Sequence, residues 1–499
     1  MNILTVPEIS FRNSEDISLL LTFMVKMMCQ FFVIRGRIFW MIFLFFLTSS
    51  QYALAQYRGP ISQTAPSFSL DTPTSYENTP FTPPVEHVVP EWAALQKKWN
   101  KYGVGVLIDY TSESAMALNG GHGGSAGYAH QIGAELDLDW GKLVGWTGFK
   151  THAVVINRAG HNLAADFGDR SLNGFQEIYG GGGNVGVKLV FLYGTQDLWH
   201  DRLQIAVGKM PVNIDFSTSP LFCTFMNKSI CGNPKSLTRG DPGFGTYPGS
   251  TYATRVRVWP LHGLYFQAGV YGTNPVLASN AYDRAGYNFS TNRYTGVYMP
   301  AEMGLIPSFG KNNLVGHYKF GVAYDTANYS DNLLDINGNA WAITGKKAQQ
   351  RNGKTQVWLE GDQMIVRNGD GPLHGFYIMA GLIRNDPETA PYLYQYYAGA
   401  VNRGFLKSRP KDMLGIIMTR ATASPRLIST QKIRYAAYQP LPGNATFPQS
   451  HLTMLEVSYS IHVWDGVSIQ PDYQLIIRPN LQKDKKSISA FGFRIHTVL

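Results

Sequence analysis

Two glycine-rich motifs could carry catalysis or hold a phosphate. Gly123–Gly127 fits the G-x-S-x-G pattern of serine hydrolases, with Ser125 as the nucleophile, and Gly181–Gly186 fits the G-x-G-x-x-G pattern of dinucleotide-binding loops. The first pattern needs a helix after the serine, and the second needs a strand–helix–strand unit around it. Neither context is present in the sequence. We therefore interpret both motifs as glycine-rich turns and expect no enzyme activity.

Histidine and cysteine are the other residue types that could bind a metal or form a covalent bond. The 12 histidines are scattered and form no H-E-x-x-H pattern, so we expect no metal site and no cofactor. Cys29 lies in the leader described below, which leaves Cys223 and Cys231. An isolated cysteine pair in an exported protein most often forms a disulfide, so we predict that bond, on an external or rim loop. The alternative, a metal site, lacks companion histidines in this segment.

Charged side chains occupy every second position of several apolar stretches. Arg255 and Arg257, for example, alternate with Val256 and Val258. Because strand side chains alternate between two faces, such a stretch has one apolar face and one charged face. A charged face fits the water-filled interior of a membrane barrel. The candidates for this interior wall are Glu135, Asp137, Asp139, Arg255, Arg257, Gln267, Glu456, Asp472, Gln474 and Arg478.

One connection is long enough to narrow such a pore. Residues 159–186 far exceed the usual 2–6 residues of a connection, and such length is normally functional or disordered. We predict that this segment folds into the pore. Its candidate constriction residues mix charge with an aromatic ring: Asp166, Asp169, Arg170, Phe175 and Glu177.

The alternation that positions these residues begins at Gly103 and continues to Leu499. Only 15% of the chain is charged, and the 51 glycines suit a structure with many turns. The strand candidates lie at 104–111, 134–140, 188–193, 203–208, 252–258, 264–270, 318–325, 355–366, 374–384, 394–401, 412–421, 431–438, 455–463, 467–477 and 491–499. A soluble sandwich could alternate in the same way, but full charges on one face and aromatic strand ends on the other favour a closed transmembrane β-barrel. At about 25 residues per strand and connection, the length predicts about 16 antiparallel strands.

The N-terminal part has a different character. Arg35 and Arg37 precede ten apolar residues, 38–47, and a small-residue site ends at Ala55, which predicts a secretory signal of residues 1–55 cleaved before Gln56. Ten helical residues span only about 15 Å, which argues against a membrane anchor. The true start could be Met27 or Met28. Residues 56–90 are rich in Pro, Ser and Thr and predict a linker, and 91–102 predict a short amphipathic helix.

Several motifs resemble one known family. QPDYQLIIRPN at 470–480 resembles the C-terminal signature of the carbohydrate-selective porin (OprB) family, and so do segments at 250–275, 312–326 and 408–416 and the Asp362-Gln363 pair. The resemblance covers about Trp92 to Leu499. It implies a 16-stranded outer-membrane barrel that admits sugars by diffusion. One departure is the last residue, Leu499, where such barrels usually end in Phe or Trp.

The resemblance and the charged alternation together predict a function. We expect passive, carbohydrate-selective diffusion of mono- and oligosaccharides into the periplasm of a Gram-negative bacterium. The alternatives are export of a polysaccharide or small solutes, an outer-membrane lipase, and a soluble periplasmic polysaccharide-binding protein. We expect outer-membrane lipid, lipopolysaccharide and the barrel-assembly machinery as partners, and no nucleic acid, because the net charge of +9 is not gathered into a basic cluster.

Within the predicted pore, five residues satisfy both the alternation and the resemblance: Arg255, Arg257, Asp472, Gln474 and Arg478. Charged groups are strong hydrogen-bond partners for sugar hydroxyls. Arg255 and Arg257 would lie about 7 Å apart on one strand and therefore repel each other unless acids or solute hydroxyls face them. We predict Asp472 and Glu456 as those acids. Arg409 and Asp412 match a motif of the family, but the sequence does not place them relative to the wall.

Overall fold

The computed structural model describes residues 86–119, 125–167, 174–178, 184–277, 284–369 and 374–499. Its contacts divide the chain into two units, Met1–Tyr52 and Ala53–Leu499, and all described residues belong to the second. The predicted signal, its cleavage site at Ala55 and Gln56, and most of the linker lie outside the described residues. So do Asp169 and Arg170 of the predicted constriction and residues 123–124 and 181–183 of the two glycine motifs.

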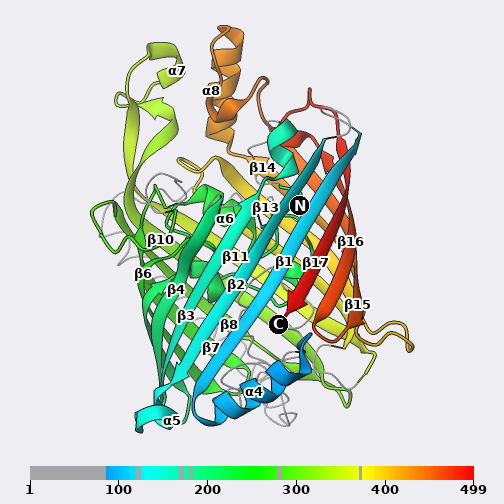
Figure 1. Cartoon of the computed structure of the whole chain (residues 1–499). Coiled ribbons are helices and arrows are strands. Elements are labelled where there is room, and N and C mark those ends of the chain that lie inside the picture. Colours follow the sequence, from blue (N-terminus) through cyan, green and yellow to red (C-terminus); the bar gives the residue numbers. More distant parts are fainter. Residues whose placement is uncertain (1–85, 120–124, 168–173, 179–183, 278–283, 370–373) are drawn as a thin grey trace, which may run out of the picture. The chain divides into compact units, whose positions relative to one another are not determined.

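One antiparallel sheet closes on itself to form a barrel (Figure 1). Each strand pairs with the next along the chain, except that β8 pairs with β10 because the two-residue β9 pairs only with the start of β10. β17 pairs back onto β1, from Asp109↔Val498 to Asn119↔Ser489, and so completes the ring. Of the seventeen strands, β9 adds nothing to the wall, so the barrel has sixteen, which confirms the predicted fold.

The strands have the following bounds: β1 Val104–Asn119, β2 Ala126–Asp139, β3 Phe149–Gly160, β4 Val185–Leu198, β5 Leu203–Met210, β6 Thr251–Leu261, β7 Leu264–Thr273, β8 Gly296–Leu305, β9 Ser308–Phe309, β10 Leu314–Asp335, β11 Ala348–Arg367, β12 Gly375–Asn385, β13 Tyr392–Arg403, β14 Met413–Ala423, β15 His451–Trp464, β16 Val467–Ile477 and β17 Ile488–Val498. The helices are α4 Pro90–Lys101, α5 Trp140–Val144, α6 Lys235–Gly240, α7 Trp341–Thr344 and α8 Pro425–Ala436. No helix among the described residues is long and apolar enough to span a membrane.

The two ends of the barrel differ in the length of their connections. β6 and β7 are joined by residues 262–263 and β15 and β16 by residues 465–466, where Gly466 adopts a left-handed φ of 76°. At the opposite end the connections are long and carry α7 and α8 (Figure 1). In bacterial outer-membrane barrels the short turns face the periplasm and the long loops face outward. We therefore call these the periplasmic end and the extracellular end.

The alternation along each strand separates a lipid face from an interior face. In β15 the even positions from Leu452 to Ser460 are buried, whereas Leu455 and Val457 are exposed. The same holds for β6, where Val256 is 39% exposed and Arg255 only 3%. Exposed apolar side chains on nearly every spanning strand would be costly in water and are stable in lipid. The alternation in the sequence therefore identifies the two faces correctly.

The interior is occupied by a long loop. Residues 211–250, between β5 and β6, are almost entirely buried, and their apolar side chains pack on inward-facing residues of the wall. Phe222 meets Tyr397 of β13 edge to face at 5.5 Å, and Phe244 meets Tyr298 of β8 in the same way at 5.9 Å. We call residues 211–250 the inner loop.

The structure corrects one strand prediction and adds two wall strands besides the two-residue β9. Residues 431–438 were predicted as a strand, but they belong to α8 and the turn after it. Pro425 in the first helical turn, and buried side chains at Leu427, Thr430 and Gln431, three and four residues apart, explain the helix. β3 and β8 were not among the predicted strands.

Candidate functional site

Arg255 and Arg257 project inward from β6 and share one carboxylate. Arg257 Nη2 lies 2.6 Å and Arg255 Nη2 lies 3.2 Å from Asp215 Oδ1, on the inner loop. Gln204 accepts a second bond from Arg255 at 2.8 Å. The predicted partners Asp472 and Glu456 were therefore wrong. The prediction paired strands with strands, whereas the counter-charge comes from a loop that folds inside the wall.

Gln267 of β7 ties this group to a second carboxylate. It accepts from Arg257 Nε at 2.7 Å and donates to Glu302 Oε1 of β8 at 2.9 Å. Glu302 is 3% exposed and also accepts from Ser217 N, Tyr265 Oη and Trp358 Nε1, each at 2.8–2.9 Å. The sequence analysis missed Glu302, although its alternation with Met299, Ala301 and Met303 is visible in β8.

Glu456, Asp472 and Gln474 also face inward, and the loops cover them completely. Glu456 accepts from the backbone N–H groups of Met226 at 2.5 Å and Asn227 at 3.0 Å. Gln474 donates to the carbonyl of Phe175 at 2.9 Å and to Asp472 at 2.6 Å. All three are at most 2% exposed. They lie on the interior wall as predicted by their alternation, but Glu456 and Gln474 bond to the loops and Asp472 bonds to Gln474.

The strands that close the barrel contribute a buried ion pair. Arg494 of β17 donates to Glu113 Oε1 of β1 from Nε at 2.9 Å and from Nη2 at 2.7 Å. Arg494 also donates to the carbonyls of Cys223 at 3.0 Å and Phe225 at 3.2 Å. The pair therefore joins the first strand, the last strand and the inner loop.

The disulfide forms within this same loop. Cys223 and Cys231 are bonded, with Cα atoms 4.4 Å apart, and both residues are buried. The prediction of an external or rim loop was wrong about the location. The bond closes a short turn beside Arg494 and Glu456, and so it shapes the part of the loop that faces β15 and β17.

The predicted constriction segment meets the inner loop. Gly174–Ile178 are buried, and Lys228 N donates to Gly174 O at 3.0 Å. Glu177 lies 3.5 Å from Lys235 Nζ, and Gln176 donates to the carbonyl of Glu113 at 2.8 Å. Asp166 is exposed instead. Residues 159–186 therefore share the interior with a longer loop that the sequence analysis did not identify as such.

The remaining predicted wall residues lie near the two ends. Asp137 of β2 is 2.5 Å from His152 Nδ1, and Glu135 is half-buried beside this pair. Asp139 accepts from Gly141 N at 3.0 Å and so caps α5 at the periplasmic end. Arg478 lies beyond the end of β16, at a left-handed φ of 60°, and does not continue the wall as predicted.

The motif residues Arg409 and Asp412 lie in the periplasmic connection between β13 and β14. Arg409 makes two bonds to Asp412, at 2.5 Å and 3.0 Å. Asp412 is 1% exposed and also accepts from Tyr459 Oη at 2.6 Å and His462 N at 3.0 Å. This network fastens the connection to β15, close to Glu456 and Ser458, which bond to the inner loop on the same strand.

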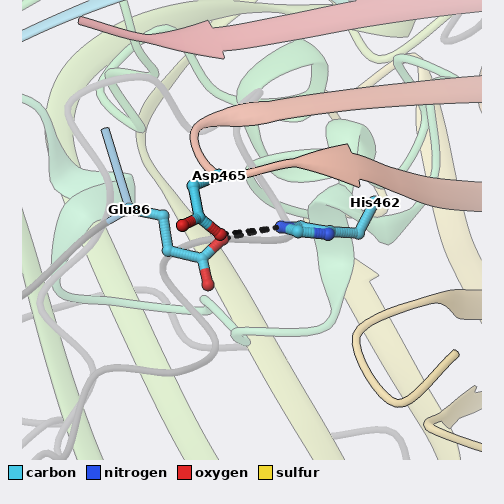
Figure 2. Close-up of side chains that lie close together, drawn as sticks. All are labelled: Glu86, His462 and Asp465. Carbon is cyan, nitrogen blue, oxygen red and sulfur yellow. Dashed lines mark hydrogen bonds and ion pairs between the residues drawn. The ribbon is translucent and has the colours of Figure 1, made fainter. Parts of the chain in front are cut away.

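Beside it, three metal-ligand residue types meet at the end of β15. Figure 2 shows His462 facing Glu86 and Asp465, at 2.7 Å and 4.0 Å. Lys411 pairs with the same two carboxylates. Because the ammonium group of Lys411 already forms ion pairs with both carboxylates, we interpret these four residues as an ion-pair cluster. It holds the segment before α4 in place, where Val88 N donates to Val498 O at 2.9 Å.

Comparisons with known proteins agree with this architecture. The family model for "Carbohydrate-selective porin, OprB family" matches residues 124–499. Porin B of Pseudomonas aeruginosa is 26% identical over 434 residues, covering 84% of this chain and 92% of that protein. The high-pH structure of Pseudomonas putida OprB superposes with a TM-score of 0.77 at 24% identity, covering 84% of this chain and 100% of that one. Its low-pH structure gives 0.51 at 16% identity, covering 83% and 98%. The two structures share the barrel fold, and because the family model covers well over half of the sequence, the chain belongs to the carbohydrate-selective porin (OprB) family.

Proposed function

We propose that mono- and oligosaccharides diffuse into the periplasm through the space that the inner loop and Gly174–Ile178 leave inside the barrel, and that the protein has no enzyme activity. As a member of its family the chain is a carbohydrate-selective porin of the Gram-negative outer membrane. The path of the sugar through the barrel, the direction of its diffusion and the residues that it contacts are what we propose.

The observation that supports it most is the anchoring of the inner loop on opposite sides of the wall. Its contacts reach β6 through Asp215 and Arg257, β8 through Ser217 and Glu302, β11 through Ser219 and Asp362, β13 through Ser236 and Gln395, β15 through Asn227 and Glu456, and β17 through Phe225 and Arg494. A loop held at so many points is rigid, and rigidity keeps the size of the opening fixed. A fixed narrow opening lets a porin discriminate between solutes by their contacts rather than admit all of them.

Polar groups that are not completely buried are the proposed sugar contacts. On the inner loop these are Thr218, Lys228, Thr238, Arg239 and Thr246, and on the wall Glu135 and Arg257. A sugar gives up hydrating water in a narrow passage, and hydroxyl and charged groups replace those hydrogen bonds. Glu456, Asp472 and Gln474, by contrast, are covered by loop backbone, and we propose that they hold the loops in place.

The outer surface supports the remaining proposed partners. Exposed apolar side chains from neighbouring strands, such as Phe266, Phe320, Leu359 and Ile416, form a surface suited to lipid chains. We propose that outer-membrane lipid and lipopolysaccharide surround the barrel and that the barrel-assembly machinery inserts it.

Planar-bilayer conductance tests the proposal. Addition of glucose or a glucose oligomer should reduce the single-channel current in a saturable way, and a non-sugar polymer of equal size should reduce it less. A matched control is Lys486→Gln, on an exposed extracellular loop, which should behave as wild type. Equal block by sugar and by polymer would contradict sugar selectivity. Growth of a porin-deficient strain on limiting sugar, restored by this protein, would support uptake over export.

A further inference from the structure

Three extracellular connections meet around α8. The connection between β10 and β11 carries α7, where the ring of Trp341 lies 5.5 Å from the guanidinium group of Arg434 on α8. The ring of Tyr435 meets that of Phe447, in the loop after α8, at 5.2 Å. Lys483, between β16 and β17, places its ammonium group 4.8 Å from the centre of the same Phe447 ring. We call Trp341, Arg434, Tyr435, Phe447 and Lys483 the α8 surface.

Buried polar contacts fix these connections to one another. Gln431 of α8 donates to Gln449 in the loop after it at 2.9 Å, and Gln449 donates to the carbonyl of Asn480 at 2.8 Å. At the start of α8, Arg426 forms an ion pair with Asp331 of β10. The α8 surface is therefore held by a helix and by the strands beneath it, so its rings and cations keep a fixed arrangement.

The α8 surface is accessible and lies in a basic part of the sequence. Tyr435 is 48% exposed, Lys483 is exposed and the other three members are half-buried. Residues 336–347 and 425–449, which contain α7 and α8, include neither Asp nor Glu. Their basic residues are Lys346, Lys347, Arg426, Lys432 and Arg434.

The position of the α8 surface is beyond the hydrocarbon of the membrane. β10 and β11 have 22 and 20 residues, whereas about ten residues of a strand cross a membrane, so their hairpin carries α7 past the lipid. Figure 1 shows α7 and α8 above the extracellular ends of the neighbouring strands. The surface therefore lies at the level of the groups that project outward from the outer leaflet.

We propose that the α8 surface binds the phosphorylated core sugars of lipopolysaccharide in the leaflet around the barrel. This rests on the outer-membrane surroundings given under the proposed function and names the place and the groups of that contact. Phosphate accepts charge-assisted hydrogen bonds from Lys and Arg, and clusters of these residues attract anionic head groups. Exposed aromatic rings offer a flat apolar surface to the apolar face of a sugar. Because lipopolysaccharide is confined to the leaflet, its local concentration beside the barrel is high, and several modest contacts act together.

The test compares lipopolysaccharides that differ in phosphate and in core sugar. Equilibrium binding to the detergent-solubilised barrel is measured with fluorescently labelled rough lipopolysaccharide, which consists of lipid A and core. The same material after removal of its phosphates, and lipid A alone, serve as comparisons. We expect the rough form to bind about fivefold more tightly than either of them, because it alone offers phosphate and core sugar together. If either comparison binds as tightly as the rough form, the inference is wrong.

Variants locate the contact. Arg434→Gln with Lys483→Gln should remove most of the preference for the rough form, whereas Arg434→Lys with Lys483→Arg, which keeps both charges, should retain it. The matched control is Lys97→Gln with Lys98→Gln, which removes the same charge from exposed positions of α4 at the periplasmic end and should bind as wild type. Unchanged binding by the first variant, or an equal loss in the control, would overturn the inference.

Sugar block separates this inference from the proposed function. All of these variants should be blocked by glucose as the wild-type protein is, because none of the substituted residues is a proposed sugar contact. Failure of glucose to block the wild-type channel would overturn the proposed function, whereas loss of the preference for rough lipopolysaccharide would overturn only the role of the α8 surface.

Discussion

Two charged regions inside the barrel are built in opposite ways. Around the middle of β6, Asp215 accepts from both Arg255 and Arg257, and Glu302 next to them accepts four hydrogen bonds. In the second region, where the inner loop meets Gly174–Ile178, the cations Arg239, Lys235 and Arg158 and the acid Glu177 lie around Lys228. In the first region, each carboxylate accepts hydrogen bonds from donors on the wall or the inner loop. In the second region, the described neighbours of Lys228 that act on its pKa are three cations and one acid.

The difference distinguishes charges that hold the inner loop in place from charges that can contact a solute. A buried charge is stable only when it is paired and hydrogen-bonded, so the balanced region can serve as the fastening of the inner loop. Several cations close together lower the stability of the folded state. Solvent or a solute anion can offset that cost. We therefore expect substitutions of fully buried members of balanced networks, such as Arg494, to damage the barrel or the loop. Substitutions of Lys228 and its charged neighbours should change which solutes pass.

The largest expected effect is on the balanced pair Arg494 and Glu113, which are 1% and 0% exposed. Arg494→Ala leaves a buried carboxylate without its partner, and breaking such a pair costs about 3–5 kcal/mol of unfolding free energy. Denaturant unfolding of the detergent-solubilised barrel measures this loss. The double variant Arg494→Met with Glu113→Leu removes both charges and should recover much of the stability. A double variant no more stable than the single one would show that the pairing is not what matters.

Removing the disulfide should have a smaller and more local effect. Cys223→Ser with Cys231→Ser frees a short loop, and closing a loop of this size contributes about 2–3 kcal/mol in the chain-entropy model. Because wall contacts also hold the inner loop, the barrel should still assemble and remain heat-modifiable on a gel. Proteolysis of the folded protein should become faster within residues 211–250. Loss of the barrel itself would mean that the loop directs folding of the wall.

The fold was predictable from the sequence because its signal is repeated on many strands. Apolar and polar residues alternate from β1 to β17, and each strand adds evidence for the same barrel. α8 shows where this fails, because Ile433, Tyr435 and Ala437 also lie at alternate positions, although the segment is helical. Eight residues are too few to separate a period of 2 from one of 3.6 when Pro425 is left out of the window.

The site was predictable only in part, because alternation gives the face of a residue and not its partner. Arg255 and Arg257 face inward as the pattern indicates, yet Asp215 and Lys228 come from an irregular loop. Loop residues carry no periodic signal. Their contacts depend on how residues 211–250 fold back between strands that are hundreds of residues away in the sequence, as between Asn227 and Glu456.

Replacing Arg255 and Arg257 by neutral residues should change ion selectivity and sugar block moderately. Arg255→Ala with Arg257→Ala leaves Asp215 without its two cations, so ion selectivity should shift toward cations. Block by neutral sugar should weaken several-fold, since Arg257 retains some solvent contact and a charged hydrogen bond in a wet pore contributes about 1 kcal/mol. Reversal potentials in a salt gradient and sugar titrations measure both. Adding Asp215→Asn to the pair should reverse the shift in ion selectivity, and an unchanged reversal potential in every variant would assign these arginines to the wall alone.

The smallest expected effect distinguishes the two regions by pH. The pKa of Lys228 is lowered to about 7, so its ammonium is present below that pH and is lost as the pH rises through it. Burial lowers this pKa most, the positive charges of Arg239, Lys235 and Arg158 also lower it, and the negative charge of Glu177 raises it. Anion preference should therefore fall about twofold between about pH 6 and pH 8.5. In Lys228→Gln the preference should already be low, and its pH dependence should flatten. Variants of Arg255 and Arg257 should keep the wild-type slope, because they leave Lys228 and its neighbours in place. An equal slope in wild type and Lys228→Gln would place the titrating group elsewhere in the pore.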